Sequence, residues 1–167
     1  PPYWAFPWAG GLALARYVLD HRDAVRGRRV LDLGAGSGIV GISAALAGAG
    51  EVLASDIDRF AVAATRLNAA ANGVRVQAVL ADLTGGPPPE VDVVLVGDLF
   101  YERDLAAKVT SFLDRCLAAG IDVIVGDPER SYLPAARLRR IAGYAVPDVG
   151  DVEAAGARPG GVFAFVA

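Results

Sequence analysis

Short runs of consecutive apolar residues alternate along this chain with longer segments in which apolar residues recur at helical spacing. The apolar runs fall at residues 30–33, 52–55, 75–80, 91–96 and 121–125, and each predicts a strand. Residues 8–21, 37–49, 60–71 and 105–119 place apolar side chains on one helical face and predict helices between the strands. Continuous apolar runs are typical of strands covered on both faces, so these five strands are expected to be parallel.

The last third of the chain has a different pattern. Residues 137–141 predict a further helix, and residues 144–149 and 161–166 predict two strands joined by an irregular segment, 150–160. No helix separates these two strands, so we expect an antiparallel hairpin at one edge of the sheet.

The expected architecture is therefore an α/β fold. It is a single-domain, Rossmann-like sheet of seven strands, mostly parallel, with an antiparallel hairpin at its C-terminal edge. Residues 1–28 form an N-terminal cap or helical segment, and residues 29–167 form the core.

Composition excludes several classes of protein. Of the 167 residues 54% are hydrophobic and 21% charged, and the net charge is −3, so we expect a globular chain with no nucleic-acid partner. No apolar run reaches the roughly 20 residues that cross a bilayer, so no membrane partner is expected. Cys116 is the only cysteine, which suits a reducing compartment and favours a cytoplasmic location. The chain has no methionine and begins "PPYW", so we expect its natural N-terminus to be missing; the oligomeric state stays open.

A glycine-rich loop follows the first predicted strand, in "VLDLGAGSGIVGI". Gly36, Gly38 and Gly41 satisfy G-x-G-x-x-G, the pattern of a dinucleotide site. Asp32, Gly34, Gly36 and Gly38 satisfy D-x-G-x-G-x-G, which fits S-adenosylmethionine (SAM) instead. In both cases bare backbone and a helix N-terminus would face the ligand.

An aspartate stands at or beside the end of each of the five strands, and ligands of open α/β sheets bind beyond those ends. These residues are Asp32, Asp56, Asp82, Asp98 and Asp127.

Three of these aspartates bear on the choice of cofactor. Asp56 can accept hydrogen bonds from both hydroxyls of a ribose, which indicates a nucleoside cofactor. Asp32 beside the loop favours the ammonium group of SAM and opposes the diphosphate of NAD. Asp82 can accept from an adenine amino group while Leu83 packs on the ring. The alternative for Asp82 is a helix cap or a simple loop carboxylate.

The fourth strand runs into "VGDLFYERD". Asp98 could hold an incoming amine through a charge-assisted hydrogen bond, and the ring of Tyr101 could form a wall of the methyl channel. The alternative is that Asp98 caps the next helix and Tyr101 belongs to the core. Other chemistries have little support, because the chain has one histidine and no Cys/His cluster for a metal, and its serines lack a histidine partner.

Four stretches of the chain resemble one family, and the similarity extends from Pro2 to Phe165. They are "FPWAGGLALARYVLDHRDAVRGRRVLDLGAGSG", "ASDIDRFAVAATRLNAAANGV", "VVLVGDLFYERDLA" and "VIVGDPERSYLP". The family is the electron transfer flavoprotein β-subunit lysine methyltransferases, seven-strand class I SAM-dependent enzymes whose bacterial members are sometimes labelled nicotinamide N-methylases. The W-x-G-G, D-x-F-Y and G-D-P-x-R motifs carry the resemblance.

This resemblance implies roles for individual residues. Trp8 matches a tryptophan near the cofactor, with Gly10 and Gly11 behind it. Asp98 and Tyr101 match an element associated with lysine substrates, and Asp127 and Arg130 match the turn that would shape the substrate rim. The expected cofactor-binding residues are Trp8, Asp32, Gly34, Ala35, Gly36, Gly38, Asp56, Ile57, Asp82 and Leu83, and the expected catalytic residues are Asp98 and Tyr101. No metal is expected.

The sequence thus predicts a SAM-dependent protein-lysine N-methyltransferase. The resemblance implies that the partner is the β subunit of electron transfer flavoprotein. One alternative is a small-molecule N-methyltransferase of the nicotinamide type, which shares everything except the acceptor pocket. Another is an NAD-binding oxidoreductase, and a third is a SAM-binding protein without activity.

Overall fold

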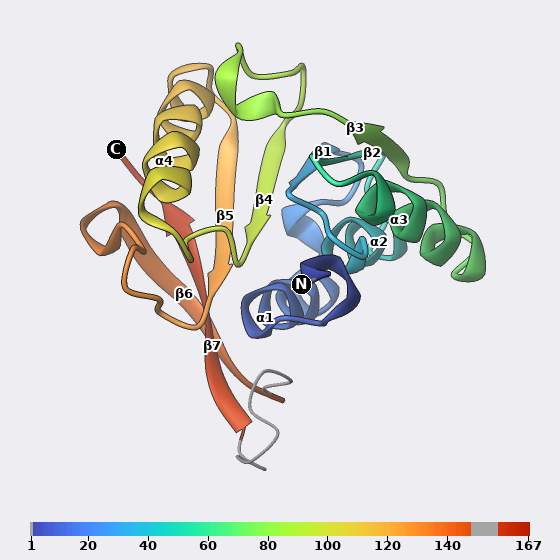
Figure 1. The fold of residues 1–167 in the computed structure, drawn as a ribbon, viewed down its shortest axis with the longest axis horizontal. Helices are drawn as coiled ribbons and strands as arrows, with labels where there is room; N and C mark the ends of the chain where they lie inside the picture. The colour runs from blue at the N-terminus through green and yellow to red at the C-terminus, as the bar shows by residue number, and fades with distance from the viewer. Residues whose placement is uncertain (1, 148–156) are drawn as a thin grey trace.

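The structure is a computed structural model that describes residues 2–147 and 157–167. One seven-stranded sheet runs through it in the order β3-β2-β1-β4-β5-β7-β6 (Figure 1). The strands are β1 (Arg29–Leu33), β2 (Glu51–Asp56), β3 (Gln77–Leu80), β4 (Val93–Gly97), β5 (Asp122–Asp127), β6 (Leu138–Pro147) and β7 (Ala157–Phe165). The four longer helices are α1 (Ala9–Asp20), α2 (Ile39–Leu46), α3 (Arg59–Ala71) and α4 (Arg103–Ala118). Short 3-10 turns, η1 to η4, are at Tyr3–Ala5, Arg22–Ala24, Leu83–Gly85 and Ala135–Arg137.

The central strands are parallel, whereas β7 runs antiparallel to β5 and β6 antiparallel to β7. This confirms the predicted seven-stranded sheet with an antiparallel edge hairpin. Among the described residues, no helix is long and apolar enough to cross a membrane.

Side chains of alternating direction on the central strands supply two cores. Val30, Val93 and Leu95 are fully buried on the face covered by α1 and α2. Their neighbours Leu31 and Val94 are fully buried on the opposite face, against Phe112 and other residues of α4. Consecutive residues of one strand therefore serve different faces, which is why the strands read as continuous apolar runs.

The predicted helix over residues 137–141 is wrong. Only Ala135–Arg137 form a 3-10 turn, and β6 begins at Leu138. Leu138 and Arg140 pair with Phe165 and Phe163 of β7, and the register shifts between Arg140 and Ala142. Leu138 and Ile141 stand three apart in the sequence, a spacing that imitates a helix, and the bulge accommodates the extra residue within the strand.

The predicted irregular segment, 150–160, needs a second correction. Residues 157–160 belong to β7 and extend the hairpin, because they pair with Tyr144, Ala145, Val146 and Pro147. Residues 150–156, and the predicted strand end at 148–149, lie outside the described residues.

Candidate active site

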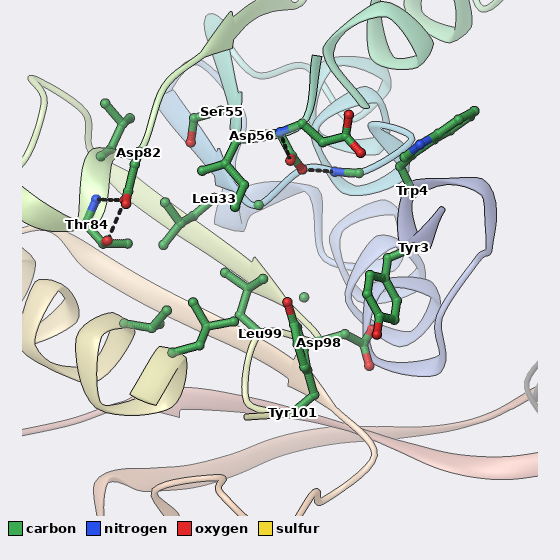
Figure 2. Close-up of a pocket in the computed structure, with 18 of the residues that line it drawn as sticks. Tyr3, Trp4, Leu33, Ser55, Asp56, Asp82, Thr84, Asp98, Leu99 and Tyr101 are labelled. Atoms are coloured by element: carbon green, nitrogen blue, oxygen red, sulfur yellow. Dashed lines mark hydrogen bonds between the residues drawn. The ribbon is translucent and has the colours of Figure 1, made fainter. Parts of the chain in front are cut away.

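A cavity of about 620 Å³ opens at the carboxyl ends of β1, β2 and β4. Its volume is within the usual range for a small-molecule site. Figure 2 shows Asp82 and Thr84 at one end of it, and Asp98, Tyr101 and Tyr3 at another. Asp82 belongs to a different sequence motif from Asp98 and Tyr101, and the sheet brings the two motifs to one place.

The glycine loop between β1 and α2 is held in place by hydrogen bonds from side chains of α3. Gly34 and Gly36 have φ angles of +67° and +56°, so the loop follows a left-handed path that favours glycine. Thr65 Oγ1 donates to the carbonyl oxygen of Gly36 at 3.0 Å, and Asn68 Nδ2 donates to that of Ser37 at 2.8 Å. These α3 side chains fix the loop and were not expected from the sequence, because nothing local connects them to it.

Asp32 lies under this loop and does not line the cavity. Its Oδ2 accepts a hydrogen bond from the Gly41 backbone N–H at 2.7 Å, inside the first turns of α2. Burial raises the pKa of the Asp32 carboxyl to about 7. The Asp32 side chain thus points into the protein, and its expected contact with the ammonium group of SAM stays a prediction. Ala35 and Gly38, also expected at the cofactor, do not line the cavity either.

Asp56 lines the cavity from the end of β2. Its Oδ2 accepts from the Gly36 N–H at 2.8 Å, and its Oδ1 accepts from the Asp58 N–H at 2.9 Å. Each carboxylate oxygen has a second lone pair. The residue therefore keeps capacity for two hydroxyl donors, as the ribose interpretation requires.

Asp82 and Leu83 also line the cavity. Asp82 Oδ1 accepts from the Thr84 N–H at 3.0 Å and so caps η3, while Asp82 Oδ2 pairs with Lys108 Nζ. The ion pair with Lys108 and the bonds from Thr84 lower the pKa of Asp82 to about 2. The side chain is thus both a turn cap and an acceptor on the cavity wall that is ionised at neutral pH, and Lys108 is its unforeseen partner.

Asp98 occupies an unusual backbone position after β4. Its φ angle is +56°, in the region that favours glycine, and its side chain is 8% exposed. Its Oδ2 accepts from the Gly11 N–H at 2.5 Å, and its Oδ1 accepts from Arg130 Nη2 at 3.0 Å. Trp8, the N-cap residue of α1, offers no side-chain cap, so Asp98 caps this helix from across the fold.

Burial raises the pKa of the Asp98 carboxyl, and the Gly11 N–H and Arg130 act in the opposite direction. Asp98 is a helix cap, although the helix that it caps is α1 and not the next one along the chain, and its role toward an amine stays a prediction. A strained backbone angle on a buried, charged residue is typical of functional sites.

Aromatic rings surround the same end of the cavity. Tyr101 stacks on Tyr3 with centroids 5.8 Å apart, and Tyr3 lies 6.0 Å from Trp8. Tyr101 is 47% exposed, so it belongs to the mouth of the site and not to the core. The N-terminal turn η1 supplies Tyr3 and Trp4 to the cavity lining, a contribution that local sequence patterns did not indicate.

The charges on the described cavity wall favour a cationic ligand. Four carboxylates line it (Asp56, Asp58, Asp82, Asp98) against two cations (Lys108, Arg130), a balance of −2. Both cations are paired with carboxylates, so neither is available to a diphosphate. Three features fit SAM. The backbone at Gly34 and Gly36 allows close approach, Asp56 can accept from ribose hydroxyls, and the negative wall suits a cationic ligand. Among the described residues, no cluster of His, Cys, Asp and Glu could hold a metal.

Comparison with known families decides between the two interpretations of the loop. The family model "Ribosomal protein L11 methyltransferase (PrmA)" matches residues 13–100, which include the loop, Asp56, Asp82 and Asp98. The chain belongs to this methyltransferase family. SAM is the methyl donor that the family implies, and the NAD interpretation is set aside.

Within the PrmA-type methyltransferases, the resemblance inferred from the motifs is confirmed. The chain is 39% identical over 153 residues to the electron transfer flavoprotein β-subunit lysine methyltransferase of Rattus norvegicus, covering 88% of this chain and 60% of the relative. It is 42% identical over 131 residues to the Homo sapiens protein of that name, covering 77% and 50%. The chain thus spans half to three fifths of the length of these relatives.

A solved structure confirms the fold. The ribosomal protein L11 methylase of Lactobacillus delbrueckii subsp. bulgaricus superposes with a TM-score of 0.61 at 24% identity, covering 92% of this chain and 77% of the other.

Proposed function

We propose that this chain carries SAM-dependent methyl transfer to a lysine side chain of a protein, and that the protein is the β subunit of electron transfer flavoprotein. The observation that carries the proposal is the joint placement of Asp56, Asp98 and Tyr101 in one cavity. A site for a nucleoside and a site for an amine thus share one space. The names of the rat and human relatives support the choice of substrate.

SAM would lie along the glycine loop, with its ribose hydroxyls on Asp56 and its adenine near Asp82 and Leu83. When bound, SAM supplies a methyl group attached to a positively charged sulfur. The residues at the other end of the cavity would then act on the acceptor. We assign the cofactor-binding roles to Trp8, Gly34, Gly36, Asp56, Ile57, Asp82 and Leu83, with Asp32 supporting the loop from beneath.

Asp98 would bind the lysine amine through a charge-assisted hydrogen bond and aim its lone pair at the methyl carbon. The bound ammonium would first lose a proton to solvent. The neutral nitrogen would then form the new N–C bond to the methyl group that SAM supplies, and the electron pair of the broken C–S bond would stay on sulfur. The methylated nitrogen then loses a proton to solvent. Tyr101 and Tyr3, at the exposed mouth, would flank the aliphatic part of the lysine.

The test is an incubation of the purified enzyme and tritiated SAM with the purified flavoprotein β subunit, in parallel with nicotinamide. We expect label on lysine of the β subunit, located by mass spectrometry, and loss of labelling in Asp98→Asn. Asp104→Asn, an exposed acid in the first turn of α4, should behave as wild type. Label on nicotinamide alone would overturn the assignment of a protein substrate but would leave the assignment of SAM as cofactor intact. Transfer to neither acceptor would contradict the proposed function.

A further inference from the structure

Arg130 already occupies the carboxylate that the acceptor amine needs. Asp98 Oδ1 accepts from Arg130 Nη2 at 3.0 Å, and Asp98 Oδ2 accepts from the Gly11 N–H. Asp98 is 8% exposed and the Arg130 side chain 27% exposed, so this pair is largely removed from water. A lysine ammonium that binds Asp98 Oδ1 would compete with Arg130 for this carboxylate.

The same corner of the fold holds a second carboxylate that is only half used. Asp127 is 0% exposed, and its Oδ1 accepts from the Arg130 backbone N–H at 2.7 Å. Its Oδ2 is buried and has no hydrogen-bond partner among residues 2–147 and 157–167, and the same is true of Arg130 Nε. The guanidinium charge of Arg130 acts on both carboxylates, because it opposes the rise in the pKa of each.

Unpaired buried donors and acceptors are costly and rare in folded proteins. Here the unpaired donor and the unpaired acceptor belong to residues three apart in one turn, so a rotation of the Arg130 side chain can satisfy both. The Trp8 ring, 6.0 Å from Arg130 Cζ, would stay beside the guanidinium.

We propose that Arg130 and Asp127 are positioning residues for a cationic acceptor: Arg130 neutralises Asp98 in the free enzyme, and its guanidinium moves to Asp127 Oδ2 when an amine replaces it. This inference rests on the proposed function, because it requires an amine acceptor. It goes beyond the proposed function by stating which residues select a cationic acceptor over a neutral one.

Charge explains why the exchange would select for cations. Asp98, Asp127 and Arg130 together carry one net negative charge when ionised, which one ammonium group balances. A neutral acceptor such as a pyridine ring cannot replace the ion pair that Arg130 gives up. The cluster would therefore admit an alkylammonium and reject a neutral small molecule of similar size.

A double-mutant cycle on the acceptor KM tests this exchange. Asp127→Asn removes the second partner of Arg130, so it should raise the KM for the β subunit about tenfold, the effect of losing one charge-assisted hydrogen bond, with kcat within about threefold. Arg130→Gln removes the competitor and should lower that KM or leave it unchanged. In the Arg130→Gln background, Asp127→Asn should change the KM less than about twofold, because Asp127 acts only through Arg130.

Arg140→Gln is the matched control, since Arg140 forms its ion pair with Glu129 of the same turn. SAM affinity by calorimetry and the thermal unfolding midpoint establish that each variant is folded. The proposal would be overturned if Asp127→Asn raised the acceptor KM equally in the wild type and in Arg130→Gln. A tenfold rise in KM for Arg130→Gln would also overturn it. If Asp127→Asn fails to fold, a lowered KM in Arg130→Gln would still support the proposal and a tenfold rise would still overturn it.

A second readout does not depend on catalysis. The Nε–H resonance of Arg130, assigned by its loss in Arg130→Gln, should move downfield when n-butylamine is added to the protein with S-adenosylhomocysteine, and should not move with pyridine. Asp127→Asn should abolish the shift. An unmoved resonance would refute the exchange. Wild-type inactivity on the β subunit would instead refute the proposed function, and the butylamine result would still settle the exchange.

Discussion

The buried carboxylate of Asp32 and the backbone N–H of Gly41 are joined by a hydrogen bond of 2.7 Å. The bond ties the end of β1 to α2, and a Cβ at Gly41 would lie only 3.0 Å from Asp32 Oδ2. The glycine loop is therefore closed from beneath by its own preceding aspartate. This fixes the loop that lines the cofactor cavity.

We expect Asp32 to make stability fall as pH rises. Burial raises the pKa of its carboxyl to about 7 from 3.8, so between these values the folded state binds more protons than the unfolded state. Stability from this residue is complete below pH 3.8 and declines as pH rises toward 7, by up to about 4 kcal/mol.

Asp32→Asn keeps an oxygen for Gly41 and removes the titration. Its urea midpoints should therefore vary less between pH 4 and 7 than those of the wild type. Parallel stability curves for the two proteins would exclude Asp32 as the titrating group.

Gly10 and Gly11 should respond oppositely to alanine. A Cβ at Gly10 would lie 2.4 Å from the Gly126 carbonyl oxygen and 2.8 Å from Asp98 Cγ, whereas one at Gly11 would meet nothing closer than 3.6 Å. Gly10→Ala should cost about 2–4 kcal/mol of unfolding free energy. Gly11→Ala should be neutral or stabilise by up to about 1 kcal/mol, since alanine favours helix. Chemical denaturation of both variants measures the difference, and equal costs would disprove the packing argument.

Substitutions at Asp56 and Asp58 should have different effects, because Asp56 is expected to bind the cofactor and Asp58 caps a helix. Asp56→Ala should weaken SAM binding about 100-fold or more, through lost ribose hydrogen bonds and a loosened Gly36. Asp58 Oδ1 caps α3 by accepting from the Phe60 N–H, so Asp58→Ala should lower stability by about 1 kcal/mol and leave SAM affinity within about threefold. Isothermal calorimetry and thermal unfolding give the two values. Wild-type affinity in Asp56→Ala would remove it from the cofactor site.

Tyr101 should act through its ring. The ring stacks on Tyr3 at the mouth of the cavity, so Tyr101→Phe should retain kcat/KM within about twofold. Tyr101→Ala should lower it about tenfold, with most of the change in the acceptor KM. Steady-state kinetics with the β subunit measure both. A large loss in Tyr101→Phe would show that the hydroxyl takes part.

Much of the fold could be read from local patterns. Buried parallel strands are recognisable in the sequence as apolar runs, because both faces of such a strand are covered. Val93 and Val94 are an example. The glycine loop and the acids at Asp56 and Asp98 follow from strand ends, because parallel strands bring those ends to one edge. The seven-stranded architecture and the placement of Asp56, Asp82 and Asp98 on the cavity wall were therefore predictable.

Only the tertiary structure determined the direction and the partners of the charged side chains. Asp32 lies within the most informative motif, yet its carboxylate faces α2, since neighbouring residues of a strand point to opposite faces. Arg130 meets Asp98 across 32 positions, and Asp98 caps a helix that begins near the N-terminus. The strand at Leu138 exists because β7 pairs with it. Periodicity determines which residues are buried, but only long-range pairing determines what a buried charge meets.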